Sequence, residues 1–315
     1  MQEALEIHPP PGDPRWSPPP PPGPARRRGR PFPPAVNLAC LLATLVSTIV
    51  AGALMTLDDP SWRAAREVLL GPRYWTLGIP YSLSLLLILG SHEMGHYIAC
   101  RIYRIEASLP FFLPAPHMFG TFGALIRIRA PFTHRRALFD VGVAGPLAGF
   151  VVAIPVLLYG LAHSTVTRQP ARPGDIGLGS CLLLEVLYPL FFRLGPETLI
   201  RIHPVFAAAW LGLLATALNL LPIGQLDGGH MLYALSPRLH ARVSRYGIPV
   251  MIVFGVVFQA WPLVTFGVIF AIIGWRHPPL LEEDSALDRG RLAIAWLALA
   301  IFLLCFIPQP VGVAR

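Results

Sequence analysis

The sequence predicts an all-α polytopic membrane protein with about six to seven transmembrane helices. Of its 315 residues, 54% are hydrophobic and only 13% are charged, and the mean hydropathy is +0.57. A helix needs about 20 apolar residues to cross roughly 30 Å of hydrocarbon, and several runs reach that length. Soluble domains rarely contain such a run, so a lipid bilayer is the expected environment of this chain.

The positive charge of the chain is a topology signal rather than a nucleic-acid-binding surface. The net charge is +8, all 25 cationic residues are arginine, and they gather at the ends of the apolar runs. Because cytoplasmic loops carry an excess of basic residues, the arginines before the first run place the N-terminus in the cytoplasm. No basic helix or aromatic stacking platform accompanies the charge, so nucleic acid is not an expected partner.

Residues 1–34 precede the first apolar run and are rich in Pro and Arg. Such a composition neither forms a helix nor buries a core, so we expect a disordered cytoplasmic tail. The first apolar run starts too late and is too long for a cleavable signal peptide. The rest of the chain divides into a transmembrane domain at residues 35–308 and a short C-terminal tail at residues 309–315.

The expected spans follow the apolar runs in order, and one of them is interrupted. Gln259, Trp261 and Pro262 break the fifth run, which predicts a pair of short spans or a re-entrant hairpin. A further apolar patch in the loop after the third span, Leu182–Phe192, is expected to lie along the membrane surface. The runs are Val36–Leu57, Pro80–Cys100, Ala137–Leu161, Pro204–Leu221, Gly247–Trp275 and Leu292–Phe306.

The segment between the second and third spans, Glu106–Arg136, predicts a membrane-associated β-like hairpin. Pro110, Pro114 and Pro116 argue against a helix there. The stretch Thr121–Arg129 places apolar side chains at alternate positions, as in a strand with one covered face. A strand edge at membrane depth could pair with an extended peptide, and an ordinary cytoplasmic hairpin is the alternative.

His92, Glu93 and His96 form an HExxH pattern within the second span. In a helix, residues i and i+4 share one face, so both imidazoles can reach one metal ion while Glu93 meets a water bound to it. Ionisable side chains inside an apolar span are costly unless they are paired or bound, which favours a Zn²⁺ site. His92 lies about 18 Å from the outer end of its span, towards the cytoplasmic side.

A catalytic zinc site needs a third protein ligand and an open position for water. Asp227 is the expected ligand, because a proline and a glycine break the fourth span before it and Asp-Gly-Gly makes a sharp turn. His230 is the alternative ligand, and a helix N-cap is the alternative role of Asp227. The other histidines, His240 and His277 among them, are expected to be solvated near the membrane interface.

These motifs make the chain resemble the site-2 protease family of intramembrane zinc metalloproteases. The resemblance rests on HEMGH, LFDVGVAGPLAGF and NLLPIGQLDGG, and FFLPAPHMFGTFGALIRI is most similar to the cyanobacterial and plastid branch. It implies one Zn²⁺ per chain, with Glu93 as the catalytic base. The implied zinc ligands are His92, His96 and Asp227, and the implied substrate or transition-state residues are Asn219, Gly145 and Gly149.

The resemblance implies a metalloendopeptidase that hydrolyses peptide bonds within or near transmembrane segments of membrane-bound proteins, in a multi-pass cell-membrane protein. The connection before the LDG segment is too short for the PDZ domain of many bacterial members, so no PDZ domain is expected. Two alternatives are a non-proteolytic membrane chaperone on a similar scaffold and a transporter whose buried His and Glu mark an ion path. The sequence leaves the substrate and the oligomeric state open.

Overall fold

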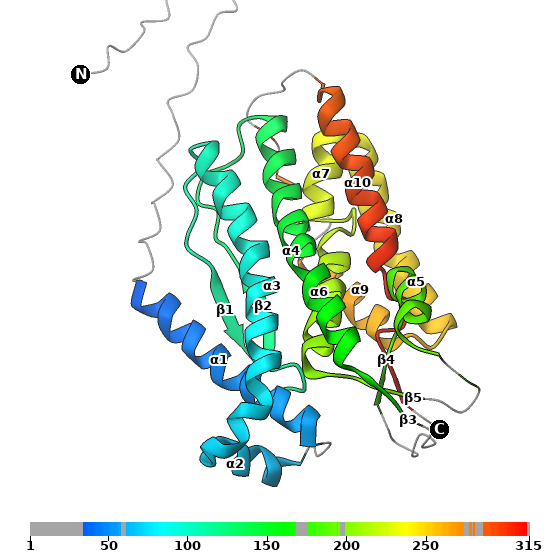
Figure 1. Ribbon diagram of the computed structural model, residues 1–315. Coiled ribbons are helices and arrows are strands. Elements are labelled where there is room, and N and C mark those ends of the chain that lie inside the picture. Colours follow the sequence, from blue (N-terminus) through cyan, green and yellow to red (C-terminus); the bar gives the residue numbers. More distant parts are fainter. Residues whose placement is uncertain are drawn as a thin grey trace, which may run out of the picture. The chain divides into compact units, whose positions relative to one another are not determined.

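The computed structural model describes residues 34–57, 61–167, 176–193, 195, 199–273, 277–278, 280 and 286–313. Contacts group residues 32–315 into one compact unit, to which all of these ranges belong. Nearly all of the proposed N-terminal tail lies outside the described residues. Three described helices are long and apolar enough to cross a membrane (Figure 1): α1 (Pro34–Leu57), α3 (Trp75–Ile102, preceded by the 3₁₀ turn Pro72–Tyr74) and α4 (Arg135–His163).

These three helices correspond to the first three expected spans, and the other apolar runs are also helical. Among the described residues, three further helical segments are apolar but shorter: α5, α6 and residues 261–272 of α9. The remaining helices are α2 (Trp62–Leu70), α5 (Leu182–Phe191), α6 (Pro204–Asn219), α7 (Asp227–Leu235), α8 (Pro237–Val257), α9 (Trp261–Ile273) and α10 (Arg289–Cys305).

Helices α1 and α3 pack closely because small residues face each other between them. A side chain at Gly78 would overlap the Ile49 carbonyl, and one at Gly52 would lie 2.6 Å from the Cβ atom of Tyr81. Between α1 and α3, Thr48 and Ser82 share a buried hydrogen bond of 2.6 Å. Close backbone approach and polar contacts replace the hydrophobic effect as the source of helix association in lipid.

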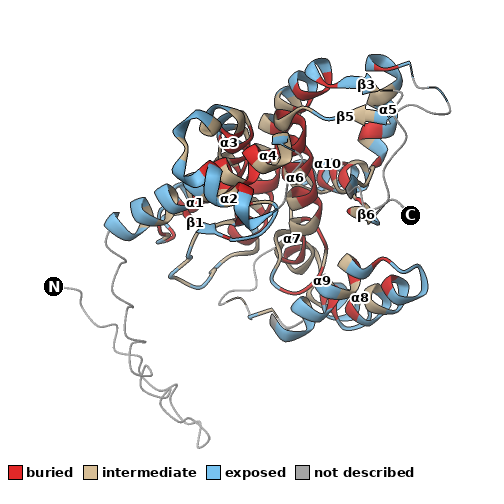
Figure 2. Ribbon diagram, turned by 90° about the horizontal axis from the view of Figure 1, so that it is seen from below, coloured by how far each residue is buried: buried red, intermediate tan, exposed pale blue. Residues whose placement is uncertain are grey.

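Helix α6 is well enclosed: its residues are buried or half-buried, and it is drawn in red and tan in Figure 2. Its Trp210 is only 1% exposed, and the indole Nε1–H donates to the Gly179 carbonyl at 2.7 Å. The largest buried hydrophobic cluster joins α6 to residues of α4, α5 and α10. Because α6 lies in this core, its C-terminal residue Asn219 is held at a fixed place beside α3.

The expected hairpin is present as β1 (Phe111–Pro114) and β2 (Thr121–Leu125), which pair antiparallel beside α1 and α3 (Figure 1). Polar groups of α1 hold it. Asn37 donates to the Leu109 and Pro110 carbonyls at 3.1 Å, and Ser47 donates to the Gly120 carbonyl at 2.6 Å. The strand β2 ends at Leu125, four residues before the end of the expected strand.

The expectation of an all-α protein with one β-like hairpin is wrong in one detail, because two further short sheets are present. In one, β3 (Thr165–Thr167) pairs with β5 (Leu199–Arg201). In the other, β4 (Ile176–Leu178) pairs with β6 (Val311–Val313), which lies in the expected C-terminal tail. Packing brings the ends of neighbouring helices together, so the chain segments that leave them lie side by side and pair.

The broken fifth run forms two helices, α8 and α9, joined by a tight turn. The turn spans residues 258–260, where Gln259 has a positive φ of 55°. The C-terminal part of α8 packs closely against α9, since a side chain at Gly255 would lie 2.7 Å from a methyl group of Val264. Helix α8 begins at Pro237, ten residues before the expected run. Its first turns carry arginines, so hydropathy alone does not include them in an apolar span.

A charged network fastens α10 to α3 and α4. Arg291 forms a bidentate pair with Asp140, with Nε 2.8 Å from Oδ1 and Nη2 2.6 Å from Oδ2. Tyr103 donates to Asp140 at 2.5 Å and accepts from Arg291 at 3.2 Å. The side chain of Asp288 caps α10, and the Arg291 backbone N–H and guanidinium hold the pKa of Asp288 below its usual value. The network joins the ends of three helices far apart in sequence.

We expect Arg291→Gln to lower the free energy of unfolding by about 1–2 kcal/mol, because a bidentate charged hydrogen bond is lost. A double-mutant cycle with Asp140→Asn, measured by unfolding in detergent, should return a coupling energy of about 1 kcal/mol. The control is the exposed pair of Arg63 and Glu67, where Arg63→Gln should cost less than about 0.5 kcal/mol. Equal losses for both arginines would contradict a clamping role for Arg291.

Candidate metal centre

Two histidines and a glutamate share one buried stretch of α3. His92, Glu93 and His96 are 5%, 7% and 6% exposed. The apolar run around them makes α3 continuous through this stretch, so the two imidazoles lie one turn apart on the same face. The helix alone therefore positions two of the three expected metal ligands, as the sequence pattern indicates.

Helix α4 provides the surface against which both imidazoles pack. A side chain at Gly145 would overlap the ring of His96, and one at Gly149 would lie 3.1 Å from the Cβ atom of His92. The Val141 carbonyl lies 2.7 Å from His96 Nδ1. A carbonyl can only accept, so Nδ1 carries the proton and the Nε2 lone pair of His96 faces the site.

Asp227 reaches the same place from a separate part of the chain. Helix α6 ends at Asn219, the chain turns, and α7 begins at Asp227. The next two residues must be glycine, since a side chain at Gly228 would overlap the Leu220 carbonyl and one at Gly229 would lie 2.5 Å from the Gly224 carbonyl. Asp227 is the first residue of α7 and not its N-cap, so its carboxylate is available to bind a metal ion.

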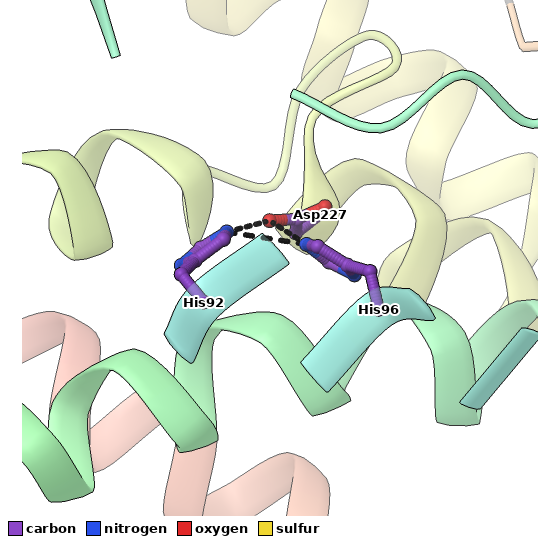
Figure 3. A group of neighbouring side chains, drawn as sticks. All are labelled: His92, His96 and Asp227. Carbon is purple, nitrogen blue, oxygen red and sulfur yellow. Dashed lines mark hydrogen bonds and ion pairs between the residues drawn. The ribbon is translucent and has the colours of Figure 1, made fainter. Parts of the chain in front are cut away.

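The three side chains point toward one another (Figure 3). Asp227 Oδ2 lies 3.2 Å from His92 Nε2 and 3.2 Å from His96 Nε2, and the two Nε2 atoms are 3.1 Å apart. Zinc bonds of about 2.0 Å at tetrahedral angles would separate ligand atoms by about 3.3 Å. The triangle therefore fits one Zn²⁺ with little adjustment.

The chemistry of these donors also calls for a cation. His96 Nε2 and the Asp227 carboxylate both present lone pairs, and the amide of Asn219 lies 3.3 Å from His92 Nε2 as a donor to that atom. Three such groups that converge in a buried site need a cation between them, either a metal ion or the proton of an imidazolium that pairs with Asp227. A search of the described residues for His, Cys, Asp and Glu side chains placed to hold a metal ion finds His92, His96 and Asp227.

His230, the alternative ligand, is not part of this group. Its Nδ1 lies 2.7 Å from Nε2 of His277, whose ring stacks on Tyr233 with centroids 4.1 Å apart. His277 Nδ1 lies 2.6 Å from the Pro278 carbonyl. These contacts direct His230 Nδ1 towards the segment that follows α9.

Glu93 and His92 face a cavity of about 190 Å³ between α3, α6 and the hairpin. The α6 side of the cavity includes Asn219, and the hairpin side includes the β2 residues Phe122 to Ala124. The backbone N–H of Ile126, just after β2, faces the Glu93 carboxylate. A water or a peptide in this cavity would therefore meet Glu93 and His92 together.

The expectation that His240 is solvated is wrong. His240 is 2% exposed, and its Nε2 lies 2.8 Å from the Gly224 carbonyl in the turn before Asp227. The sequence carries no signal for this contact, because a histidine beside arginines near a helix start resembles an interfacial residue. Only the packing of α8 against the turn identifies it.

Comparisons with known proteins relate this chain to a family of peptidases. The family model described as Peptidase family M50 matches residues 80–258. The probable zinc metalloprotease EGY1, chloroplastic, is 30% identical over 237 residues in Oryza sativa subsp. japonica, which is 73% of this chain and 40% of that protein. In Arabidopsis thaliana, EGY1 is 30% identical over 240 residues, 73% of this chain and 43% of that protein. A solved structure, the site-2 protease from Methanocaldococcus jannaschii, aligns with a TM-score of 0.38 at 17% identity, over 78% of this chain and 92% of that chain.

The family match covers more than half of the 315 residues, so the chain belongs to peptidase family M50, the site-2 protease family. The family predicted from the HEMGH and LDG segments is thereby confirmed, with relatives among plastid proteins. The chain spans about two fifths of the length of these curated relatives.

We expect Gly145→Ala to weaken zinc binding by about tenfold or more, because the new methyl group would displace the His96 imidazole. Zinc affinity of the purified protein, measured by competition with a chromogenic chelator, tests this. Gly90→Ala is the matched control, since its methyl group would lie 3.5 Å from the Phe112 ring in ordinary contact. Unchanged zinc affinity in Gly145→Ala would show that α4 does not hold the ligand in place.

Proposed function

We propose that this protein is an intramembrane zinc metalloendopeptidase that hydrolyses peptide bonds within or near transmembrane segments of membrane-bound proteins. The observation that carries the proposal is the triangle of His92, His96 and Asp227 beside a cavity that also contains Glu93. Membership of peptidase family M50 and relatives named zinc metalloproteases support the same activity. One Zn²⁺ per chain is the expected cofactor.

Glu93 is the proposed catalytic base. A bound Zn²⁺ would supply Lewis acidity, polarising the peptide carbonyl and making water acidic enough to be deprotonated near neutral pH. Glu93 accepts the proton of the attacking water and returns it to the leaving amine. The backbone N–H of Ile126 faces its carboxylate, and the buried setting limits exchange with bulk water.

Asn219 is proposed to bind the substrate or the transition state. Its amide lies at the end of α6, 3.3 Å from His92 Nε2 and on the wall of the cavity. When the lone pair of His92 is used for metal binding, the Asn219 amide can donate to the oxygen that gains charge on the substrate. For Gly145 and Gly149 we propose a role through the ligands, because they let α4 approach the imidazoles.

The hairpin supports a way to hold the substrate extended. The backbone groups of Arg127 and Arg129 bond to Ser108 and Glu106, so those of Ile126, the residue before Arg127, face the opposite edge, towards Glu93. Phe122 and Ala124 share that edge by the two-residue alternation of a strand, and they line the cavity. A peptide that pairs with this edge as an added strand would lose its helical conformation and expose its backbone carbonyls.

The chain is proposed to lie in the cell membrane with about six or seven crossings and its N-terminus in the cytoplasm. Arg101 at the end of α3 and Arg135 and Arg136 at the start of α4 mark the same side of the membrane, which we assign to the cytoplasm. The metal ligands of α3 lie in its C-terminal half, nearer that side. The transmembrane substrate is then selected by the cavity and the hairpin, without a PDZ domain.

Glu93→Gln should reduce cleavage of a model transmembrane substrate by about 10²–10⁴-fold, because the amide cannot accept a proton. The zinc content, measured by elemental analysis, should stay at about one per chain, since Glu93 is not a ligand. Cleavage by purified protein in detergent or vesicles is followed by gel. Cleavage retained by the Gln variant would rule out Glu93 as the base, and no zinc in the unmutated protein would favour a non-proteolytic role.

Asp227→Ala should lower the zinc content of the purified protein, and His230→Ala should not. The reason is that Asp227 Oδ2 faces both imidazoles, whereas His230 Nδ1 contacts His277. Elemental analysis after dialysis against a weak chelator gives the two values. The reverse result would reassign the third ligand to His230.

A further inference from the structure

Side chains of α8 bind the turn before Asp227 at a single glycine. Gly224 lies between the end of α6 and the start of α7 and has a positive φ of 56°, which favours glycine. Its N–H donates to Ser244 Oγ at 3.0 Å, and its carbonyl accepts from His240 Nε2 at 2.8 Å. Both backbone groups of Gly224 are therefore satisfied by side chains of one helix.

His240 and Ser244 lie one turn apart on α8 and act on Gly224 together. Their side chains contact each other, with Ser244 Oγ 3.2 Å from His240 Nε2. The Gly224 carbonyl can only accept, so His240 Nε2 carries a proton. His240 is 2% exposed and Ser244 is fully buried. Loss of either partner would leave a buried backbone group unsatisfied, and water would not readily replace it.

The carbonyl that His240 binds also touches the helix that carries Asp227. A side chain at Gly229, in the first turn of α7, would lie 2.5 Å from the Gly224 oxygen. The Gly224 peptide thus lies between α8, which holds it, and α7, which packs on it. A shift of this peptide changes the start of α7, where Asp227 is the first residue. Metal ligands tolerate displacements of only about 0.2 Å.

We propose that His240 and Ser244 are positioning residues for the metal site: through Gly224 they fix the direction in which Asp227 presents its carboxylate to His92 and His96. This inference rests on the proposed zinc site and adds two residues to it. Neither side chain touches the metal ligands or the cavity. Their effect passes through one backbone peptide to the ligand three residues later.

The test measures the zinc affinity of the full-length protein in detergent, by chelator competition, for His240→Phe and Ser244→Ala. Each should bind zinc about 10- to 100-fold more weakly, as for other groups that orient a ligand. His240→Gln keeps an N–H donor at a similar reach and should recover most of the affinity. If His240→Phe does not fold, Ser244→Ala carries the test, because it removes only one oxygen atom.

A merely structural role would lower stability without changing zinc affinity, so the melting temperature of the zinc-free protein is measured in parallel. Ser164→Ala is the matched control. Ser164 is buried and accepts the His203 backbone N–H at 2.9 Å, but it follows the far end of α4. It should lose stability like Ser244→Ala and keep the zinc affinity of the unmutated protein.

Two results would overturn the inference: unchanged zinc affinity in Ser244→Ala and His240→Phe, or an equal loss in Ser164→Ala. Failure of the zinc site itself is distinguished by Asp227→Ala. If that variant binds zinc like the unmutated protein, the proposed ligand is wrong. If it loses zinc while the α8 variants do not, the ligand stands and the positioning role of His240 and Ser244 is wrong.

Discussion

The structure depends on the convergence of three lone-pair donors in a buried, apolar setting. His92, His96 and Asp227 bring their ligand atoms within 3.2 Å of one another, a spacing close to that of tetrahedral zinc ligands. Such a cluster exists only if the surrounding helices hold it, since the ligands come from α3 and α7. The packing of α4, α6 and α8 around it can be understood as that support.

Glycine is the means by which the helices come close enough. Gly145 and Gly149 let α4 contact the imidazoles. Gly228 and Gly229 let the first turn of α7 pack against the backbone of the segment that follows α6. In lipid, where apolar surface gains little by burial against another helix, close backbone approach and hydrogen bonds hold helices together. The same residues that assemble the membrane domain therefore also set the geometry of the metal site.

A protease in a membrane must also separate a substrate backbone from its own helix, because helical carbonyls are already hydrogen-bonded. The cavity beside Glu93 is bordered by two rigid helices and by a hairpin whose strand edge faces it. Helix α1 holds that hairpin through Asn37 and Ser47. The first span, which lies before the region matched to the family, thus contributes to the place where a substrate would bind.

The sequence by itself determined the membrane class, the helix that carries His92, Glu93 and His96, and the family, because helical periodicity and an i, i+4 ligand pair are local. It also predicted Asp227 and the hairpin, since Gly and Pro mark the breaks in the apolar runs. Only the tertiary structure places Asp227, rather than His230, beside the two imidazoles, and only it identified His240, because both depend on which helix packs against the turn. Contacts between segments distant in the chain leave no periodic pattern, so the support around the site could not be read from the sequence.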